Sequence, residues 1–217
     1  MHIEFWKDRW KAGQIGFHLP EVNPYLTDYW DKLNAEEGAV VLVPLCGKSL
    51  DMAWLASKQY GVLGVECSQK AIEEFFQEQQ LTYKTGDLNS FKVHNSYNIN
   101  LLEGDFFSLN KDILEDIEFV YDRASLVALP EPMRKQYVDL LIKSLPEKVS
   151  ILLVTIEYDQ SLMSGPPFSV SESEVERLYK PHFLVEIIHE ADVLNDQPRF
   201  KEKGLNKMIE RVYKISR

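Results

Sequence analysis

From residue 39 onward, the chain alternates short apolar runs with segments of helical periodicity. Residues 39–45 (AVVLVPL) and 61–66 (GVLGVE) are continuous apolar runs, which are typical of strands buried on both faces. Apolar residues follow each run at helical spacing, over 48–58 and 68–80. Alternation at these lengths predicts right-handed βαβ units and a parallel sheet.

The rest of the chain extends this pattern. Helices are expected to open at Pro130 and at Ser171, whereas residues 82–97 are polar and uneven and fit either a hairpin or a loop. The predicted fold is therefore α/β, with a doubly wound, mostly parallel sheet. Further strands are expected at Ile99–Leu102, Phe119–Tyr121, Ile151–Ile156, Phe183–Ile188 and Lys207–Ile215.

Residues 1–37 precede the first strand and are helical in pattern and rich in aromatic residues. Asn23 and Pro24 suit the start of a second helix, as cap and first helical residue, that runs to about Asn34. This segment must pack as an addition to the sheet. Because no linker or repeat divides the chain, residues 1–217 are expected to form one domain.

Composition and charge exclude several classes of protein. With 45% hydrophobic and 27% charged residues, the chain can bury a sizeable core. Its net charge of −10 disfavours nucleic acid, whose binding depends on Lys and Arg neutralising phosphates. No run approaches the ~20 apolar residues of a membrane span, and the start lacks a signal-peptide core, so the cytoplasm is expected.

Metal chemistry is also not expected. Cys46 and Cys67 form no CxxC pair, and we expect both to be reduced thiols that pack in the protein interior. The five histidines lie far apart and match no metal-ligand spacing. No GxSxG motif marks a hydrolase nucleophile.

In an open parallel sheet, ligands bind beyond the carboxyl ends of the strands. Glu66 ends the second predicted strand, about 20 residues after the first turn, where a carboxylate can accept both hydroxyls of a ribose. The alternative is an exposed strand-end glutamate, and the flanking pattern favours the ribose.

The first turn is not suited to phosphate. Gly47-Lys48-Ser49 resembles the end of a P-loop, but that motif needs a glycine at position 42, which is Leu. A dinucleotide fingerprint needs three spaced glycines, and Asp51 would repel a bound phosphate that Lys48 attracts. The turn therefore favours a ribose-bearing ligand without phosphates.

Two later strand ends leave alternatives open. Asp105 follows the third strand and could accept from an adenine amino group or could simply form a turn after Gly104. Arg123 could form a structural ion pair with Asp122. It could instead be a charged hydrogen-bond donor that faces the reaction centre, and the pattern favours this second interpretation.

Long blocks along the chain resemble the thiopurine S-methyltransferase family in its bacterial form. They are FWKDRW, GQIGFHLPEVNPYL, VPLCGKSLDMAWLA, GVECSQKAIEEFF, EGDFFSL, YDRASLVALP, LLVTIEYDQSLMSGPPFSV and PRFKEKGL. The resemblance implies the seven-stranded sheet of class I methyltransferases, with residues 1–37 as a helical lid over the site. It departs from the superfamily at PLCGKS, which replaces the usual glycine-rich first motif.

The resemblance also implies a reaction. The methyl group of S-adenosylmethionine (AdoMet) would pass to an aromatic or heterocyclic thiol, leaving S-adenosylhomocysteine, and selenium or tellurium compounds are further implied acceptors. Such thiols ionise readily, so no general base is assigned. The implied cofactor contacts are Trp10, Leu45, Glu66 and Arg123, and the implied acceptor contacts are Phe17, Pro166, Arg199 and again Arg123.

The residues and the resemblance agree on this cofactor. AdoMet carries a ribose but no phosphate, and its sulfonium cation suits the aromatic faces of Trp6 and Trp10. Two alternatives remain: a non-catalytic binding protein on a methyltransferase fold, and a nicotinamide-dependent oxidoreductase, which the loss of glycines disfavours. We expect a monomer that takes a small-molecule acceptor.

Overall fold

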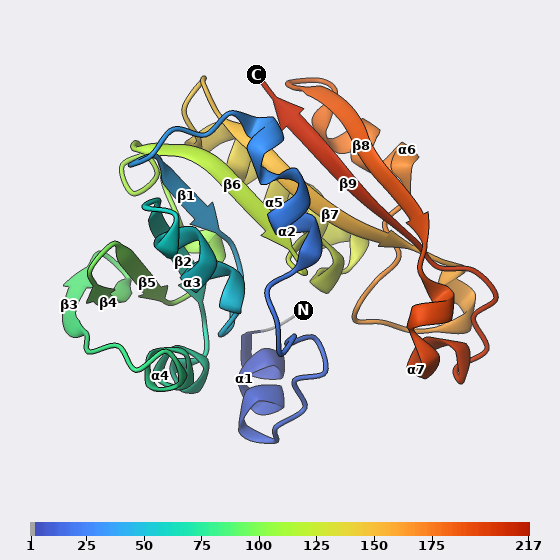
Figure 1. Ribbon diagram of the computed structural model, residues 1–217, viewed down its shortest axis with the longest axis horizontal. Coiled ribbons are helices and arrows are strands. Elements are labelled where there is room, and N and C mark those ends of the chain that lie inside the picture. The colour runs from blue at the N-terminus through green and yellow to red at the C-terminus, as the bar shows by residue number, and fades with distance from the viewer. Residues whose placement is uncertain (1–2) are drawn as a thin grey trace.

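A nine-stranded sheet forms the centre of the computed structural model, which describes residues 3–217 (Figure 1). Met1 and His2 of the predicted N-terminal segment lie outside the described residues. The strand order is β3-β4-β5-β2-β1-β6-β7-β9-β8. The strands are β1 Val40–Val43, β2 Gly61–Glu66, β3 Lys84–Leu88, β4 Phe91–Ser96, β5 Ile99–Glu103, β6 Ile117–Arg123, β7 Ser150–Glu157, β8 Leu184–Asp192 and β9 Ile209–Ser216.

The five central strands run parallel, from β5 through β2, β1 and β6 to β7. β9 pairs antiparallel with β7, and β8 pairs antiparallel with β9 at one edge. The carboxyl ends of β1, β2 and β6 therefore meet at one end of the sheet, where the start of antiparallel β9 joins them.

The strand count corrects the seven expected from the resemblance. The two additional strands are β3 and β4, an antiparallel pair that extends the sheet beyond β5. The segment 82–97 is thus a hairpin. Every residue of β3 is exposed, so this strand has no buried face and leaves no apolar alternation in the sequence.

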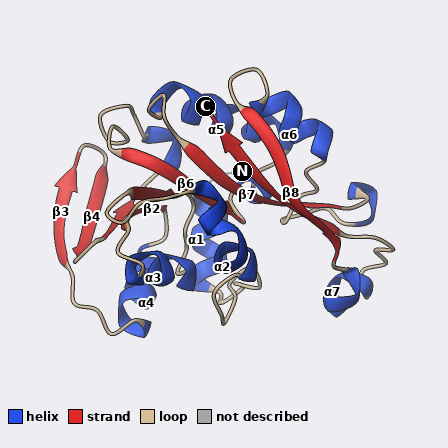
Figure 2. Cartoon of the chain, turned by 45° about the horizontal axis from the view of Figure 1, so that its top comes forward, coloured by secondary structure: helices blue, strands red, loops and turns tan. Residues whose placement is uncertain are grey.

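Helices cover both faces of the sheet, which confirms the doubly wound arrangement (Figure 2). On one face, α2 (Pro24–Tyr29), α3 (Leu50–Ser57) and α4 (Gln69–Glu78) bury apolar side chains against the strands. On the other face, α5 (Glu131–Ser144) and α6 (Glu172–Tyr179) do the same. Two further helices, α1 (Ile3–Lys11) and α7 (Pro198–Lys201), lie near the carboxyl ends of the strands.

Serine caps fix where three of these helices begin. The side chains of Ser49, Ser68 and Ser171 accept from backbone N–H groups in the first turns of α3, α4 and α6. Each cap satisfies one N–H group that has no partner inside the helix. Asn23 and Pro24 open α2 in the same manner, as the sequence predicts.

Two predicted boundaries shift for local reasons. The second helix does not run unbroken to Asn34, because α2 ends at Tyr29 and a 3-10 turn, Trp30–Leu33, follows it. The first strand ends at Val43 rather than at residue 45, because Leu45 has a φ of 44° and leaves the extended region.

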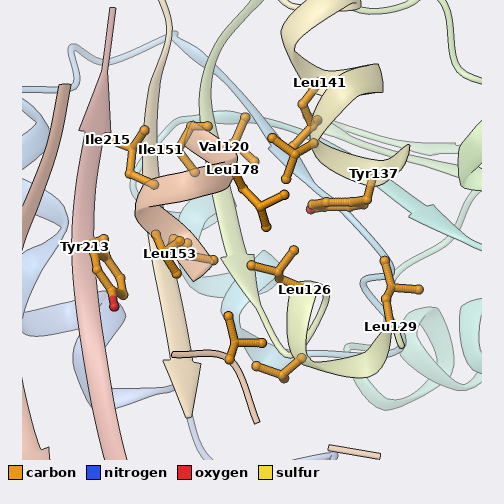
Figure 3. Close-up of a cluster of buried hydrophobic side chains, with 14 of the residues drawn as sticks. Val120, Leu126, Leu129, Tyr137, Leu141, Ile151, Leu153, Leu178, Tyr213 and Ile215 are labelled. Atoms are coloured by element: carbon orange, nitrogen blue, oxygen red, sulfur yellow. The ribbon is translucent and has the colours of Figure 1, made fainter. Parts of the chain in front are cut away.

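The face under α5 and α6 contains a buried polar contact. Figure 3 shows Tyr137 of α5 among Leu126, Leu129 and Leu141. The Tyr137 hydroxyl donates to Asp122 Oδ2 at 2.6 Å, and both side chains are fully buried. Burial raises the pKa of the Asp122 carboxyl, and the hydrogen bond from Tyr137 opposes that rise.

Tyr137→Phe is expected to lower the free energy of unfolding by about 1.5–3 kcal/mol, the usual value of a hydrogen bond to a charged group. Asp122 then keeps its Leu126 N–H partner at 3.2 Å but loses the shorter bond. The variant raises the folded-state pKa of Asp122 further, so the loss should be greater near pH 8 than near pH 4. Urea denaturation at both pH values measures it.

Tyr179→Phe is the matched control. Tyr179 is equally buried, but its hydroxyl has no hydrogen-bond partner within residues 3–217. Its stability should stay within about 0.5 kcal/mol of the parent chain. Equal losses in the two variants would contradict the role given to the Tyr137–Asp122 bond.

Candidate functional site

A cavity of about 550 Å³ opens where the parallel strands end. Its floor comes from the ends of β1, β2, β6 and β7, and its wall comes from residues 3–23, which we call the N-terminal cover. In Figure 1, α1 of this cover stands clear of the sheet, below α2 and α3. All seven predicted site residues line the cavity: Trp10, Phe17, Leu45, Glu66, Arg123, Pro166 and Arg199.

Glu66 lies at the end of β2 and is 5% exposed. Its Oε2 accepts from the Gly47 N–H at 3.0 Å, and its Oε1 accepts from the Ser68 N–H at 2.8 Å. The Cys67 thiol is a weak third donor at 3.3 Å. Burial raises the pKa of the Glu66 carboxyl, while these backbone donors oppose the shift. The carboxylate joins the two turns that follow β1 and β2.

The turn after β1 brings the backbone close to the cover. Leu45 and Gly47 both have positive φ values, 44° and 55°. A side chain at Gly47 would place its Cβ 3.0 Å from the Trp10 ring, so that ring packs directly on the glycine. The turn therefore depends on glycine both for its backbone conformation and for the space that Trp10 occupies.

The charged residues of this turn are already paired. Lys48 Nζ lies 2.6 Å from Glu78 and 2.9 Å from Glu74, and the residue is 8% exposed. Asp51 accepts from the Asn23 N–H at 2.8 Å and from the Tyr121 hydroxyl at 3.0 Å. Lys48 is thus held by two carboxylates, which supports the expectation that the turn does not bind phosphate.

Basic side chains fasten the N-terminal cover by its carbonyl groups. Arg123 Nη1 donates to the Phe17 carbonyl at 3.1 Å, and Arg199 Nη1 donates to the Gly16 carbonyl. Lys70 of α4 donates to the Trp10 carbonyl at 3.0 Å. Phe17 packs edge-on against Trp10, with ring centroids 5.5 Å apart. The cover is therefore an aromatic wall held by three cations.

Two of the open alternatives are decided by these contacts. Asp122 bonds to Tyr137 and Leu126 while Arg123 donates to Phe17, so the structural ion pair between neighbours is wrong. Asp105 Oδ1 accepts from the Phe107 N–H at 2.9 Å and is not part of the cavity lining. Asp105 therefore forms a turn after Gly104, which was one of the two interpretations that the sequence left open.

Several cavity residues were missed in the sequence. Glu210 at the start of β9, Tyr25 of α2 and His18 of the cover all line the cavity. So does Arg9, whose buried Nε has no hydrogen-bond partner within the described chain. None of these positions follows a parallel strand, so the rule that located Glu66 and Arg123 does not reach them.

Three further findings concern the cysteines, metal binding and membrane spans. Both cysteines are free: Cys46 is buried as expected, whereas Cys67 is partly exposed beside Glu66. Across residues 3–217, no three His, Cys, Asp or Glu side chains gather as they would around a metal ion. Within the same range, no helix has the length and apolarity to span a membrane.

Comparison with known proteins places the sequence close to one family. The family profile described as thiopurine S-methyltransferase matches residues 1–217. The thiopurine S-methyltransferase of Pseudomonas putida KT2440 is 46% identical over 217 residues, covering 100% of each chain. That of Pseudomonas fluorescens Pf0-1 is 48% identical over 215 residues, covering 99% of each.

Solved structures share the fold at low identity. Magnesium protoporphyrin IX methyltransferase from Synechocystis PCC 6803, with bound S-adenosylhomocysteine, has a TM-score of 0.65 at 14% identity, covering 100% of each chain. A Burkholderia thailandensis 1,6-didemethyltoxoflavin-N1-methyltransferase, also with S-adenosylhomocysteine, has a TM-score of 0.65 at 14% identity, covering 99% of this chain and 87% of that one.

Proposed function

Because this chain belongs to the thiopurine S-methyltransferase family, we propose that its cavity is where AdoMet and a small thiol acceptor meet. The chain is an AdoMet-dependent S-methyltransferase, so neither the non-catalytic binding protein nor the nicotinamide-dependent oxidoreductase is retained. The observation that supports the location is one cavity lined by every predicted contact. Trp10, Leu45, Glu66 and Arg123 would hold the cofactor, and Phe17, Pro166 and Arg199 would hold the acceptor.

The side chains present fit this cofactor. A carboxylate offers about four acceptor positions, and the two backbone N–H groups take two of those on Glu66. Two ribose hydroxyls can take the others, displacing the weak Cys67 thiol donor. The unpartnered Arg9 Nε offers a charged donor to the cofactor's carboxylate.

The opposite part of the cavity suits an anionic, aromatic acceptor. Phe17, Pro166 and Phe200 give it apolar surface, while the guanidinium groups of Arg123 and Arg199 supply positive charge. Positive charge favours the thiolate over the thiol, and the thiolate is the stronger nucleophile. AdoMet supplies an electrophilic methyl group, so the residues act mainly by aligning the acceptor sulfur and stabilising its charge.

The organisation of the protein is part of the proposal. We treat residues 1–217 as one domain, with residues 1–37 as an extension over the site, because the cover contacts the β1, β6 and α4 regions directly. One chain supplies every proposed contact, which supports a monomer. The two free cysteines support a reducing compartment such as the cytoplasm.

A methyl-transfer assay with AdoMet and a panel of acceptors tests the proposal. The panel should hold a thiopurine, substituted thiophenols, an aliphatic thiol, and selenium and tellurium compounds, with phenols and anilines as oxygen and nitrogen controls. Methylation of the thiopurine and thiophenols well above the controls is expected. Absence of transfer to every sulfur acceptor, at saturating AdoMet, would refute the proposed site and acceptor class.

Gly47→Ala is expected to weaken AdoMet binding at least tenfold. The added Cβ meets the Trp10 ring at 3.0 Å and sits on a backbone with a φ of 55°, so the turn and the cover must both shift. Gly38→Ala is the control, because Gly38 has a φ of 88° but no atom within 4 Å of the added Cβ. Calorimetry with AdoMet should show wild-type affinity for Gly38→Ala. Equal affinities for both variants would contradict the close packing of Trp10 on this turn.

A further inference from the structure

A glutamate outside the predicted site lies on the wall of the cavity. Glu210 is the second residue of β9 and pairs with Ile156 near the carboxyl end of β7, and both residues line the cavity. The same wall carries Arg123, which pairs with Val154 further back along β7. Glu210 therefore lies across β7, on the same cavity, from the cation that the proposed function assigns to the acceptor thiolate.

Groups from three elements act on the Glu210 carboxyl: Tyr25 of α2, Arg123 of β6 and His189 of β8. Tyr25 and Arg123 line the same cavity as Glu210, and the His189 ring packs against the Tyr25 ring with centroids 5.2 Å apart. Asp196, in the segment after β8, also lines the cavity, and its charge acts on Tyr25. A nearby arginine favours the ionised form of this half-buried carboxylate, which is the form that can receive a proton.

Burial has the opposite effect on this group. It raises the pKa of Glu210 above the usual glutamate range, while Tyr25, Arg123 and His189 lower it. A carboxylate with a raised pKa is a better proton acceptor near neutral pH than an exposed one.

We propose that Glu210 is the proton acceptor for thiols that are not ionised in solution, and so extends the enzyme to acceptors of high pKa. The inference rests on the proposed function, since it places a thiol in this cavity. Heterocyclic thiols ionise readily and need no base, whereas alkyl thiols, which are no more acidic than cysteine with its pKa near 8.5, are mostly protonated at neutral pH.

The step balances without another reactant. The S–H proton moves to a carboxylate oxygen of Glu210, and the S–H electron pair stays on the acceptor sulfur. That sulfur forms a bond to the methyl carbon, and the electron pair of the broken methyl–sulfur bond stays with the donor sulfur. Negative charge passes from Glu210 to the acceptor sulfur, so Arg123 faces one negative charge before and after the proton moves.

Glu210→Gln tests this with an acceptor series of graded pKa. For an alkyl thiol, kcat/KM at neutral pH should fall about 100-fold, the usual range for loss of a positioned base. For a thiopurine or a thiophenol ionised at that pH, it should fall less than about threefold. Glu186→Gln is the matched control: Glu186 is exposed on β8, and all acceptors should react as with the parent enzyme.

A second readout does not depend on turnover. A chromophoric thiol of high pKa, bound with S-adenosylhomocysteine, should show the ultraviolet band of its thiolate with the parent enzyme but not with Glu210→Gln. In Tyr25→Phe, the carboxylate loses the influence of the Tyr25 hydroxyl, which lowers the pKa of Glu210, so this pKa rises. The acid limb of the alkyl-thiol pH profile should then move to higher pH, which loss of packing alone would not produce.

The outcomes separate the two proposals. If the parent enzyme methylates no thiol, the proposed function fails. If it does, and Glu210→Gln lowers kcat/KM equally for ionised and protonated acceptors or leaves the thiolate band intact, the role of Glu210 is overturned. Calorimetric binding of S-adenosylhomocysteine to each variant shows that the protein is folded.

Discussion

Replacing Glu66 with alanine is expected to lower the affinity for AdoMet by at least about 100-fold. The ribose would lose two hydrogen bonds to a charged acceptor, each worth about 1.5–3 kcal/mol. The change also removes the acceptor for the Gly47 and Ser68 N–H groups, so the two turns beside the cofactor lose their common anchor. Isothermal titration calorimetry with AdoMet and with S-adenosylhomocysteine measures the loss.

Two further variants make this result specific. Glu66→Gln keeps one acceptor oxygen and should lose affinity to an intermediate degree. Glu103 is the register partner of Glu66 on β5, but its carboxylate bonds to His94 at 2.9 Å and does not line the cavity. Glu103→Gln should bind AdoMet as the parent does. Affinity within about threefold of the parent in Glu66→Ala would rule out a ribose bond to this carboxylate.

The second large effect is expected at Arg123. Arg123→Ala should reduce kcat/KM for a thiopurine by about 100- to 1,000-fold, the range seen when one donor to a developing charge is removed. The same variant frees the Phe17 carbonyl, so the cover loosens and AdoMet affinity should fall as well. Steady-state kinetics and calorimetry on the same preparation separate the two effects.

Two controls accompany this variant: Arg123→Lys and the replacement of a distant arginine. Arg123→Lys keeps the charge but not the planar group of donors, so its activity should fall between those of the parent and Arg123→Ala. Arg177→Ala removes an exposed arginine that pairs with Glu131 and Glu174 on the far helices, and it should leave kinetics unchanged. Parent-like turnover of a thiopurine by Arg123→Ala would contradict its placement at the acceptor.

The central sheet could be predicted because its strands are buried on both faces. The continuous apolar run at 61–66 gives β2 with its observed bounds, and the caps at Ser68 and Ser171 mark α4 and α6. The strands at the edges of the sheet left weaker patterns in the sequence. β3 is exposed throughout, and its pairing with β4 comes from backbone hydrogen bonds that no apolar pattern records.

The residues of the candidate site also divide into those that the sequence could predict and those that it could not. Glu66 and Arg123 were found because each ends a parallel strand, and parallel strands end at one edge. Glu210 comes from β9, which returns antiparallel beside β7, so its place depends on a pairing between distant segments. Lys48 shows the reverse: its motif suggested anion binding, yet Glu74 and Glu78 from α4 already neutralise it.

The carbonyl contacts of the N-terminal cover also bear on folding order. Its anchors lie 60, 106 and 183 residues away along the chain, at Lys70, Arg123 and Arg199. A nine-residue helix such as α1 has little stability alone, and contacts between distant residues require the intervening chain to close first. The N-terminal cover is therefore expected to be among the last segments to reach its native position.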